Sequence, residues 1–201
     1  MIPFFSSAAL LLSFLFFPGA PKPGVVFVKP PVHTLVTKLA KPKADDEYIP
    51  WGTHNRLTWD DFLCAPKSNT DAVASTSTAL GIAYQIKNGK FTYQITCKFS
   101  KNKSWGLVKT PYILAHEQGH FDITEIFARK LYQALQGYQL NRTSFQSDIN
   151  AIYEAVVAAK ESFQMAYDGQ TDHSRNKRKQ AEWLERINAL LEDTQPYAAY
   201  P

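Results

Sequence analysis

Residues 110–120, TPYILAHEQGH, decide how the centre of this 201-residue chain folds. The hydroxyl of Thr110 is suited to accept a hydrogen bond from a free helix amide, and Pro111 suits the first helical position, whose amide has no partner. Gly137 is typical of the residue that follows a helix end. We therefore expect a helix over residues 111–136.

One face of this helix is apolar and carries the two histidines of the stretch. Three apolar residues fall near the face of His116: Ile113, Ile123 and Phe127. The histidines are therefore expected to point inward. Glu125 and Arg129 are spaced as an i, i+4 ion pair, which we expect on the outer side of the helix.

The motif HEQGH places His116 and His120 one helical turn apart, so that both imidazoles can reach one metal ion. Glu117 follows His116 and lies within reach of a metal-bound water. This HExxH pattern is typical of zinc peptidases, and it predicts a zinc site in which Glu117 acts as general acid and base. A surface helix that carries two histidines by chance is the competing interpretation, and the apolar face argues against it.

A catalytic zinc ion usually has three protein ligands and one open position for water, so a further ligand is needed. In the segment AYDGQTDHS, residues 166–174, Gly169 predicts a helix end, and Thr171 or Asp172 is the expected cap of another helix. His173 would lie in the first turn of that helix, and it is the favoured third ligand over the other two histidines, His33 and His54.

Three acidic residues are alternatives for the third ligand. Glu154 lies 34 residues after His120 on the next expected helix, where some peptidases place a ligating glutamate. Asp168 and Asp172 are also candidates, although turn chemistry alone explains both. Tyr167 is a candidate to assist the oxyanion, with core packing as its other interpretation.

Four segments together resemble a bacterial domain-of-unknown-function family of proposed zinc-dependent proteases. They are LTWDDF at 57–62, the strand end and Ser-Trp at 99–105, LAHEQGHFDITEIFARKL at 114–131, and YDGQTDHS at 167–174. The resemblance implies an extracytoplasmic zinc hydrolase with His116 and His120 as ligands, Glu117 as catalytic acid and base, and His173 as the third ligand. The family often has glycine after the last histidine, where this chain has Ser174.

Alternating apolar residues over 80–86 and 91–99 flank Asn88-Gly89, a pattern that predicts a β-hairpin with one apolar face. The HEQGH helix is the expected cover for that face. Apolar stripes predict two more helices, over about residues 144–167 and 172–191. The expected fold class is α+β, a small antiparallel sheet with a hairpin packed on the zincin-like helix, followed by two further helices.

The expected organisation has four parts. They are a signal peptide or N-terminal anchor at 1–20, a Pro/Lys-rich linker at 21–47, a zinc metallopeptidase-like domain at 48–193 and a flexible tail at 194–201. An apolar run at 10–17 predicts export to the periplasm or secretion, with a membrane tether if the segment is retained. The only two cysteines, Cys64 and Cys97, are compatible with a disulfide or with free thiols.

The chain has a net charge of +4 and a basic cluster at residues 175–179. The cluster has no interleaved aromatic residues and is not part of a nucleic-acid-binding motif. We therefore expect no nucleic-acid partner, whereas the HEQGH motif predicts a peptide or protein substrate. The sequence leaves the oligomeric state open. The predicted function is hydrolysis of peptide bonds through a zinc-activated water. The alternatives are a non-catalytic zinc-containing binding module of the cell envelope and a zinc amidase that acts on a non-protein amide.

Overall fold

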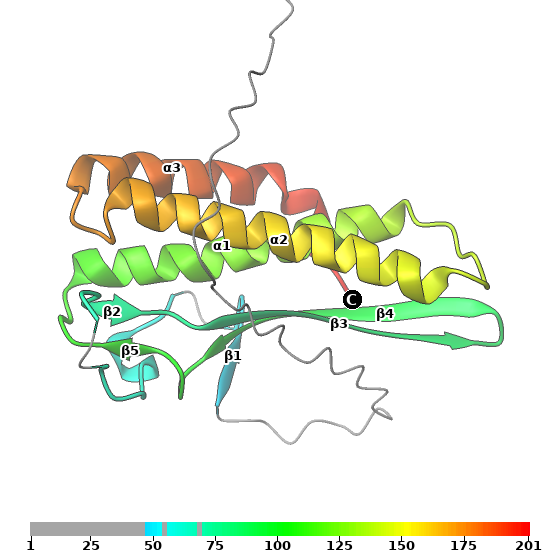
Figure 1. Ribbon diagram of the computed structural model, residues 1–201, viewed down its shortest axis with the longest axis horizontal. Helices are drawn as coiled ribbons and strands as arrows, with labels where there is room; N and C mark the ends of the chain where they lie inside the picture. The colour runs from blue at the N-terminus through cyan, green and yellow to red at the C-terminus, as the bar shows by residue number, and fades with distance from the viewer. Residues whose placement is uncertain (1–46, 54–55, 68–69) are drawn as a thin grey trace, which may run out of the picture. The chain divides into compact units, whose positions relative to one another are not determined.

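The computed structural model describes residues 47–53, 56–67 and 70–201. The predicted signal segment, nearly all of the linker, His33 and His54 lie outside the described residues. Within the described part, two small antiparallel sheets and three long helices form an α+β fold (Figure 1). The predicted fold class is confirmed.

The predicted hairpin consists of β3 (Thr78–Lys87) and β4 (Lys90–Ser100). Asn88 and Gly89 join the strands, and both have positive φ angles, 53° and 74°, as the turn type with the right twist requires. Strand β1 (Tyr48–Pro50) pairs with the other edge of β4, giving the order β1-β4-β3. The apolar residues face each other across the hairpin in four pairs: Leu80 with Cys97, Ile82 with Ile95, Tyr84 with Tyr93, and Ile86 with Phe91.

A second, two-stranded sheet pairs β2 (Ala74–Ser75) with β5 (Trp105–Gly106). The short 3-10 helix η1 (Trp59–Asp61), from the LTWDDF segment, packs against it. A Cβ added at Gly106 would lie 2.5 Å from the Trp59 ring, so only glycine allows this contact. The Trp59 indole also donates to the carbonyl of Thr110 at 3.2 Å, which ties the segment to the residue that caps the next helix.

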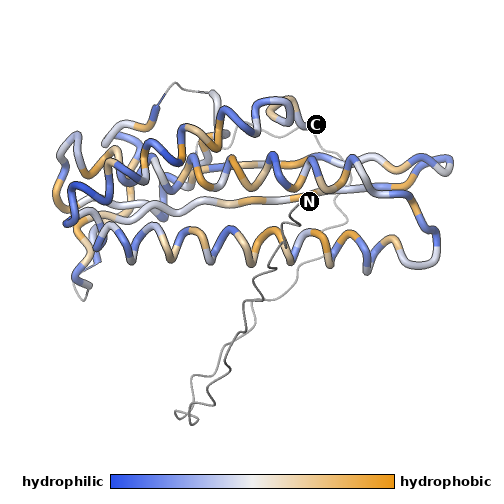
Figure 2. The backbone as a smooth tube through the Cα atoms, turned by 90° about the horizontal axis from the view of Figure 1, so that it is seen from above, coloured by the Kyte–Doolittle hydropathy of each residue, from blue (hydrophilic) through white to orange (hydrophobic). Residues whose placement is uncertain are grey.

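Helix α1 (Pro111–Gln136) has the predicted bounds. The Thr110 hydroxyl accepts from the amide of Ile113 at 3.2 Å, and Gly137 is the C-terminal cap. The helix contacts both long strands and both other helices, so it lies at the centre of the fold (Figure 1). Apolar residues recur along all three helices and along the hairpin, both strands of which α1 contacts (Figure 2).

The expectation that Glu125 and Arg129 lie on the outer side of α1 is wrong. Both side chains are almost completely buried, at 1% and 3% exposure, and Arg129 Nε donates to Glu125 Oε1 at 2.8 Å. Residues that follow α1 by more than fifty positions cover the pair, because Arg129 also donates to the carbonyl of Leu191 and Tyr200 donates to Glu125. The pair therefore belongs to the core.

Helices α2 (Phe145–Thr171) and α3 (Lys177–Asp193) differ from prediction where they meet. Helix α2 continues through Gly169 to Thr171, and Asp172 is its left-handed cap. A glycine inside a helix costs only about 1 kcal/mol relative to alanine, and tertiary contacts outweigh that cost here. The predicted end at Gly169 is therefore wrong, as is the placement of His173 in a first helical turn, because His173 lies in the turn before α3.

Residues after α3, expected to form a flexible tail, include the 3-10 helix η2 (Gln195–Tyr197) and return to the core. The hydroxyl of Tyr200 donates to Glu125 at 2.7 Å, and the amide of Ile95 in β4 donates to a carboxyl-terminal oxygen of Pro201 at 2.6 Å. None of the helices in the described part of the chain has the length and apolarity that a bilayer span requires.

Both cysteines are free thiols in the structure. Cys97 is buried on the core face of β4, whereas Cys64 is partly exposed. Burial raises the pKa of the Cys97 thiol well above its usual range, and the nearby Glu125 carboxylate raises it further. Cys97 therefore acts as a small apolar core residue.

Candidate metal centre

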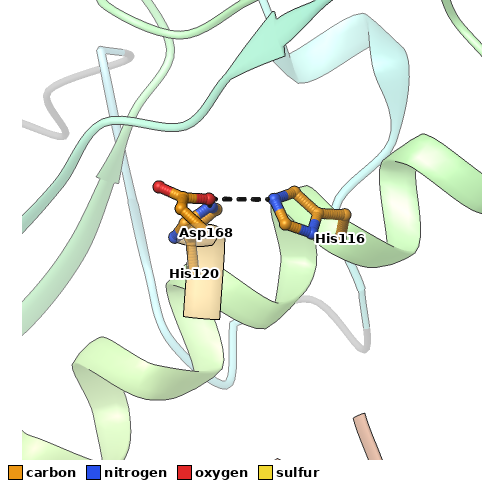
Figure 3. A group of neighbouring side chains, drawn as sticks. All are labelled: His116, His120 and Asp168. Atoms are coloured by element: carbon orange, nitrogen blue, oxygen red, sulfur yellow. Dashed lines mark hydrogen bonds and ion pairs between the residues drawn. The ribbon is translucent and has the colours of Figure 1, made fainter. Parts of the chain in front are cut away.

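Three side chains from two helices converge at one end of the molecule. His116 and His120 extend from α1 and Asp168 from α2, and Asp168 Oδ1 lies 3.2 Å from His116 Nε2 and 3.0 Å from His120 Nε2 (Figure 3). Among the described residues these three form the one group whose potential ligand atoms lie within 4.8 Å of one another. The structure thus contains a candidate metal site of two histidines and one aspartate.

The spacing of these donors fits a zinc ion. Ligands at about 2.0–2.2 Å from a tetrahedral zinc lie about 3.4 Å from one another. The two separations that Asp168 makes, 3.0 and 3.2 Å, are close to that value. Imidazole nitrogen and carboxylate oxygen are also the donor types that catalytic zinc sites combine.

Gln164 orients His120, and the sequence did not identify it. Its side-chain oxygen contacts His120 Nδ1, and its side-chain nitrogen donates to the carbonyl of His120 at 3.0 Å. A contact to the second ring nitrogen fixes the imidazole so that Nε2 faces the metal position. Gln164 precedes Asp168 by one helical turn of α2, and this spacing is the signal that could have revealed it.

Tyr167 holds His116 from the other side. Its ring stacks on the His116 ring at a centroid separation of 4.5 Å, and its hydroxyl donates to the His116 carbonyl at 3.2 Å. Gly119 provides the space, because a Cβ there would lie 2.6 Å from that hydroxyl. Burial, followed by the charges of Glu117 and Asp168, raises the pKa of Tyr167 well above its usual range. These contacts are those of a positioning residue, and the oxyanion role stays a prediction.

The three grouped side chains are electrostatically coupled. Burial alone raises the pKa of Asp168, but hydrogen bonds with His116 and His120 outweigh it and hold the pKa well below its usual range. Burial lowers the pKa of His120, but the Asp168 carboxylate outweighs it and the net pKa is raised. Asp168 is therefore ionised and available as an anionic ligand.

Glu117 is buried beside the group and faces a cavity of about 280 Å³. The cavity wall also includes His116, Asp168 and His173. Glu117 is only 4% exposed, and its Oε2 has no hydrogen-bond partner within the described part of the chain. The Nδ1 of His116 is likewise buried without a partner there. The site therefore contains two hydrogen-bonding atoms that pair with no other group of the described structure.

His173 lies at the rim of this cavity. Its side chain is 59% exposed, and its Nδ1 is 3.8 Å from Asp168 Oδ1. Asp172, His173 and Ser174 have consecutive positive φ angles of 49°, 48° and 72°, a strained conformation for non-glycine residues. A glycine would adopt the φ angle of Ser174 without this strain. The structure brings His173 close to the group, and its role as a ligand stays a prediction.

The other two acidic alternatives lie elsewhere. Glu154 is exposed on α2, 14 residues before Asp168 and therefore about 21 Å away along the helix axis. Asp172 is exposed at the end of α2. Of the three acidic alternatives, the structure brings only Asp168 to the two histidines of HEQGH.

A protein-family model matches residues 64–174, more than half of the chain, and it is described as a bacterial protein of unknown function, DUF922. The chain belongs to this family. The matched DUF922 segment contains the hairpin, the HEQGH helix, Asp168 and His173, so the predicted resemblance to a bacterial family of unknown function is confirmed. No curated protein and no solved structure matches the chain.

Proposed function

We propose that this DUF922 protein is a zinc-dependent peptidase in which His116, His120 and Asp168 hold the ion. Glu117 acts as general acid and base. The observation that carries the proposal is the buried Glu117 carboxylate, which faces the cavity beside the donor group with one oxygen unpaired. A buried carboxylate without partners is expensive, and its retention is explained if a water or substrate group completes its hydrogen bonds.

The chemistry assigned to Glu117 follows from its position. As part of the cavity wall, the Glu117 carboxylate can accept a proton from a water in the cavity, and the same carboxyl can later donate that proton to the departing amine. His120 is held by Gln164 and His116 by Tyr167, so neither ring needs to reorganise. A zinc ion bound there would supply Lewis acidity, which makes water more acidic and polarises a carbonyl.

The edge of β2 supports a peptide substrate. The amide of Leu107 donates to the carbonyl of Val73 at 2.8 Å, so the backbone groups of Val73 face β5. Because backbone groups of successive residues in a strand face opposite sides, the amide and carbonyl of Ala74 face away from β5. Ala74 lines the cavity that contains Glu117. An extended peptide could therefore bind by strand addition beside the catalytic groups.

A non-catalytic zinc-binding module is the second candidate, and the position of His173 favours it. If His173, 3.8 Å from Asp168, becomes a fourth ligand, the ion has no open position for water. Sites with four protein ligands are typically structural. A zinc amidase would use the same groups as the peptidase and differ only in substrate.

Export is a separate proposal and rests on the apolar run at residues 10–17. We propose that the protein acts outside the cytoplasm, with the N-terminal segment either cleaved or retained as a tether. Cell fractionation of the full chain, with N-terminal sequencing, tests this proposal. Recovery of the uncleaved chain from the cytoplasm would contradict it.

The proposed activity is tested with the zinc-loaded full chain and a mixed peptide library analysed by mass spectrometry. Glu117→Gln should retain zinc but reduce kcat by about 10²–10⁴-fold, the usual contribution of a general acid or base. Glu154→Gln is the matched control, because Glu154 is exposed on α2 and should not affect turnover. Unchanged turnover in Glu117→Gln would remove Glu117 from the mechanism. A wild-type protein that binds zinc and cleaves no peptide would contradict the peptidase assignment.

A further inference from the structure

A second cavity, of about 290 Å³, also borders the metal group. His120 and Asp168 form part of its wall, and residues 76–78 form another part. The first cavity is bordered by residues 72–75, so one continuous segment, 72–78, passes along both cavities. The candidate metal group therefore lies where two binding spaces meet, as expected for a substrate that extends to both sides of the reacting bond.

The second cavity is lined entirely by polar residues and includes a buried lysine. Lys160 is 7% exposed, and its Nζ lies 2.9 Å from Oε1 of Glu161, whose side chain is 58% exposed. An exposed carboxylate is a weak partner for a buried ammonium group. Thr76 lines the same cavity, and its buried hydroxyl has no partner among the described residues. Lys160 and Thr76 therefore both border one polar space, the first with a weakly paired ammonium group and the second with an unpaired hydroxyl.

Lys160 belongs to the same stripe of α2 as the groups that form the site. Lys160, Gln164 and Asp168 are spaced four residues apart, so Lys160 lies two turns, or about 12 Å, from Asp168 along the helix. An extended peptide advances about 3.3 Å per residue. A substrate group that reaches Lys160 would therefore lie within about four residues of the scissile bond.

We propose that this second cavity is a subsite for a carboxylate of the peptide substrate and that Lys160 determines this specificity. The carboxylate is either an acidic side chain or the free C-terminus of the peptide, since both offer the same acceptor to the ammonium group and the Thr76 hydroxyl. The inference rests on the proposed peptidase function. It deepens that function by naming the substrate class.

The test uses peptides with Glu, Gln or Lys at each of four positions on either side of the cleaved bond, each with a free or amidated C-terminus. The wild-type protein should show a KM about 10-fold to 100-fold lower for the carboxylate at one position than for its neutral counterpart, with little change in kcat, as expected for a charged hydrogen bond. A preference for Glu over Gln identifies a side-chain carboxylate. A preference for the free over the amidated end identifies the C-terminus.

Substitutions assign the preference to the subsite. Lys160→Met keeps the aliphatic stem and should abolish the preference, whereas Lys160→Arg should retain it. Thr76→Val should weaken it by a few-fold and does not remove a buried charge, so it also serves if Lys160→Met fails to fold. Lys87→Met, at an exposed position near the hairpin turn, is the matched control.

A binding measurement separates this inference from the peptidase proposal. Two zinc-loaded proteins are titrated calorimetrically with the same peptides: the Glu117→Gln variant and the double variant that also carries Lys160→Met. Tighter binding of the carboxylate peptides that is lost with Lys160→Met supports the subsite, even if the wild-type protein cleaves nothing. Peptide cleavage or binding without a carboxylate preference, or a preference that survives Lys160→Met, would overturn the subsite and leave the peptidase proposal intact.

Discussion

Helix α1 carries two buried polar regions that differ in how completely they are hydrogen-bonded. Glu125 accepts from Arg129 and from Tyr200, and Arg129 also donates to the carbonyl of Leu191. Two turns earlier, Glu117 Oε2 and His116 Nδ1 have no partner in the described structure. All four side chains belong to residues that are less than 5% exposed. The difference indicates that the first region stabilises the fold, whereas the second retains capacity for a ligand.

The largest effect is expected from a substitution in the fully hydrogen-bonded region, which contains Glu125 and Arg129. Arg129→Met leaves the Glu125 carboxylate buried without its ion pair, and we expect it to lower the free energy of unfolding by about 3–5 kcal/mol. Urea unfolding monitored by circular dichroism measures the loss. Arg178→Met is the control, because Arg178 pairs with Glu182 at an exposed site and its loss should leave stability close to that of the wild type. Equal stability of the two variants would contradict the structural role of the buried pair.

The next largest effect is expected from a substitution that removes a contact to the metal-site region, where Glu117 and His116 have unpaired atoms. Gln164→Leu removes the contact that orients His120, and we expect zinc affinity to fall by about 10-fold to 100-fold. Competition with a chromogenic chelator measures the affinity. Gln146→Leu, at an exposed position near the start of α2, should bind zinc as the wild type does. If the two variants bind zinc equally well, Gln164 does not orient the site.

Glu117→Gln sharpens the comparison because we expect it to change stability in the opposite direction to Arg129→Met. Replacing a buried, unpaired carboxylate with a neutral amide should raise the stability of the metal-free protein by about 1 kcal/mol, while activity is lost. The same change at Glu125 should lower stability, because both of its oxygens have partners. Thermal unfolding of the two variants side by side checks the prediction. A loss of stability at Glu117 as large as that at Glu125 would remove the distinction between the regions.

Tyr167→Phe is expected to have the smallest effect. It removes one hydrogen bond, to the His116 carbonyl, and should cost about 0.5–1.5 kcal/mol of stability with kcat within about 10-fold of the wild type. Unfolding and steady-state kinetics measure the two quantities. A fall in kcat of about 10²–10³-fold with zinc retained would instead support the predicted oxyanion role.

Patterns among neighbouring residues were sufficient to predict the hairpin and α1 from the sequence. Asn88-Gly89 between two alternating segments defines the turn and the register, and Thr110 with Pro111 defines where the helix begins. These features depend on residues that are neighbours in the chain. The sequence could therefore predict the two histidines, Glu117 and the element that holds them.

Tertiary contacts determined what the sequence did not predict. Helix α2 passes Gly169 because the Trp183 indole of α3 donates to Gln170 at 3.0 Å and Thr171 is fully buried. This extra turn places Asp168 on the helix, facing the histidines. The i, i+4 spacing of Glu125 and Arg129 predicted an ion pair but contained no information about the residues that cover it. The acidic residue that completes the group was therefore only one of several sequence alternatives.

Zinc binding by the full chain and two variants, Asp168→Ala and His173→Ala, tests the central claim most directly. Elemental analysis and chelator competition should give one zinc ion per wild-type chain, an affinity more than about 100-fold weaker in Asp168→Ala, and an affinity within about 10-fold of the wild type in His173→Ala. Loss of zinc from His173→Ala with retention in Asp168→Ala would instead identify His173 as the third ligand. That result would contradict the site of His116, His120 and Asp168.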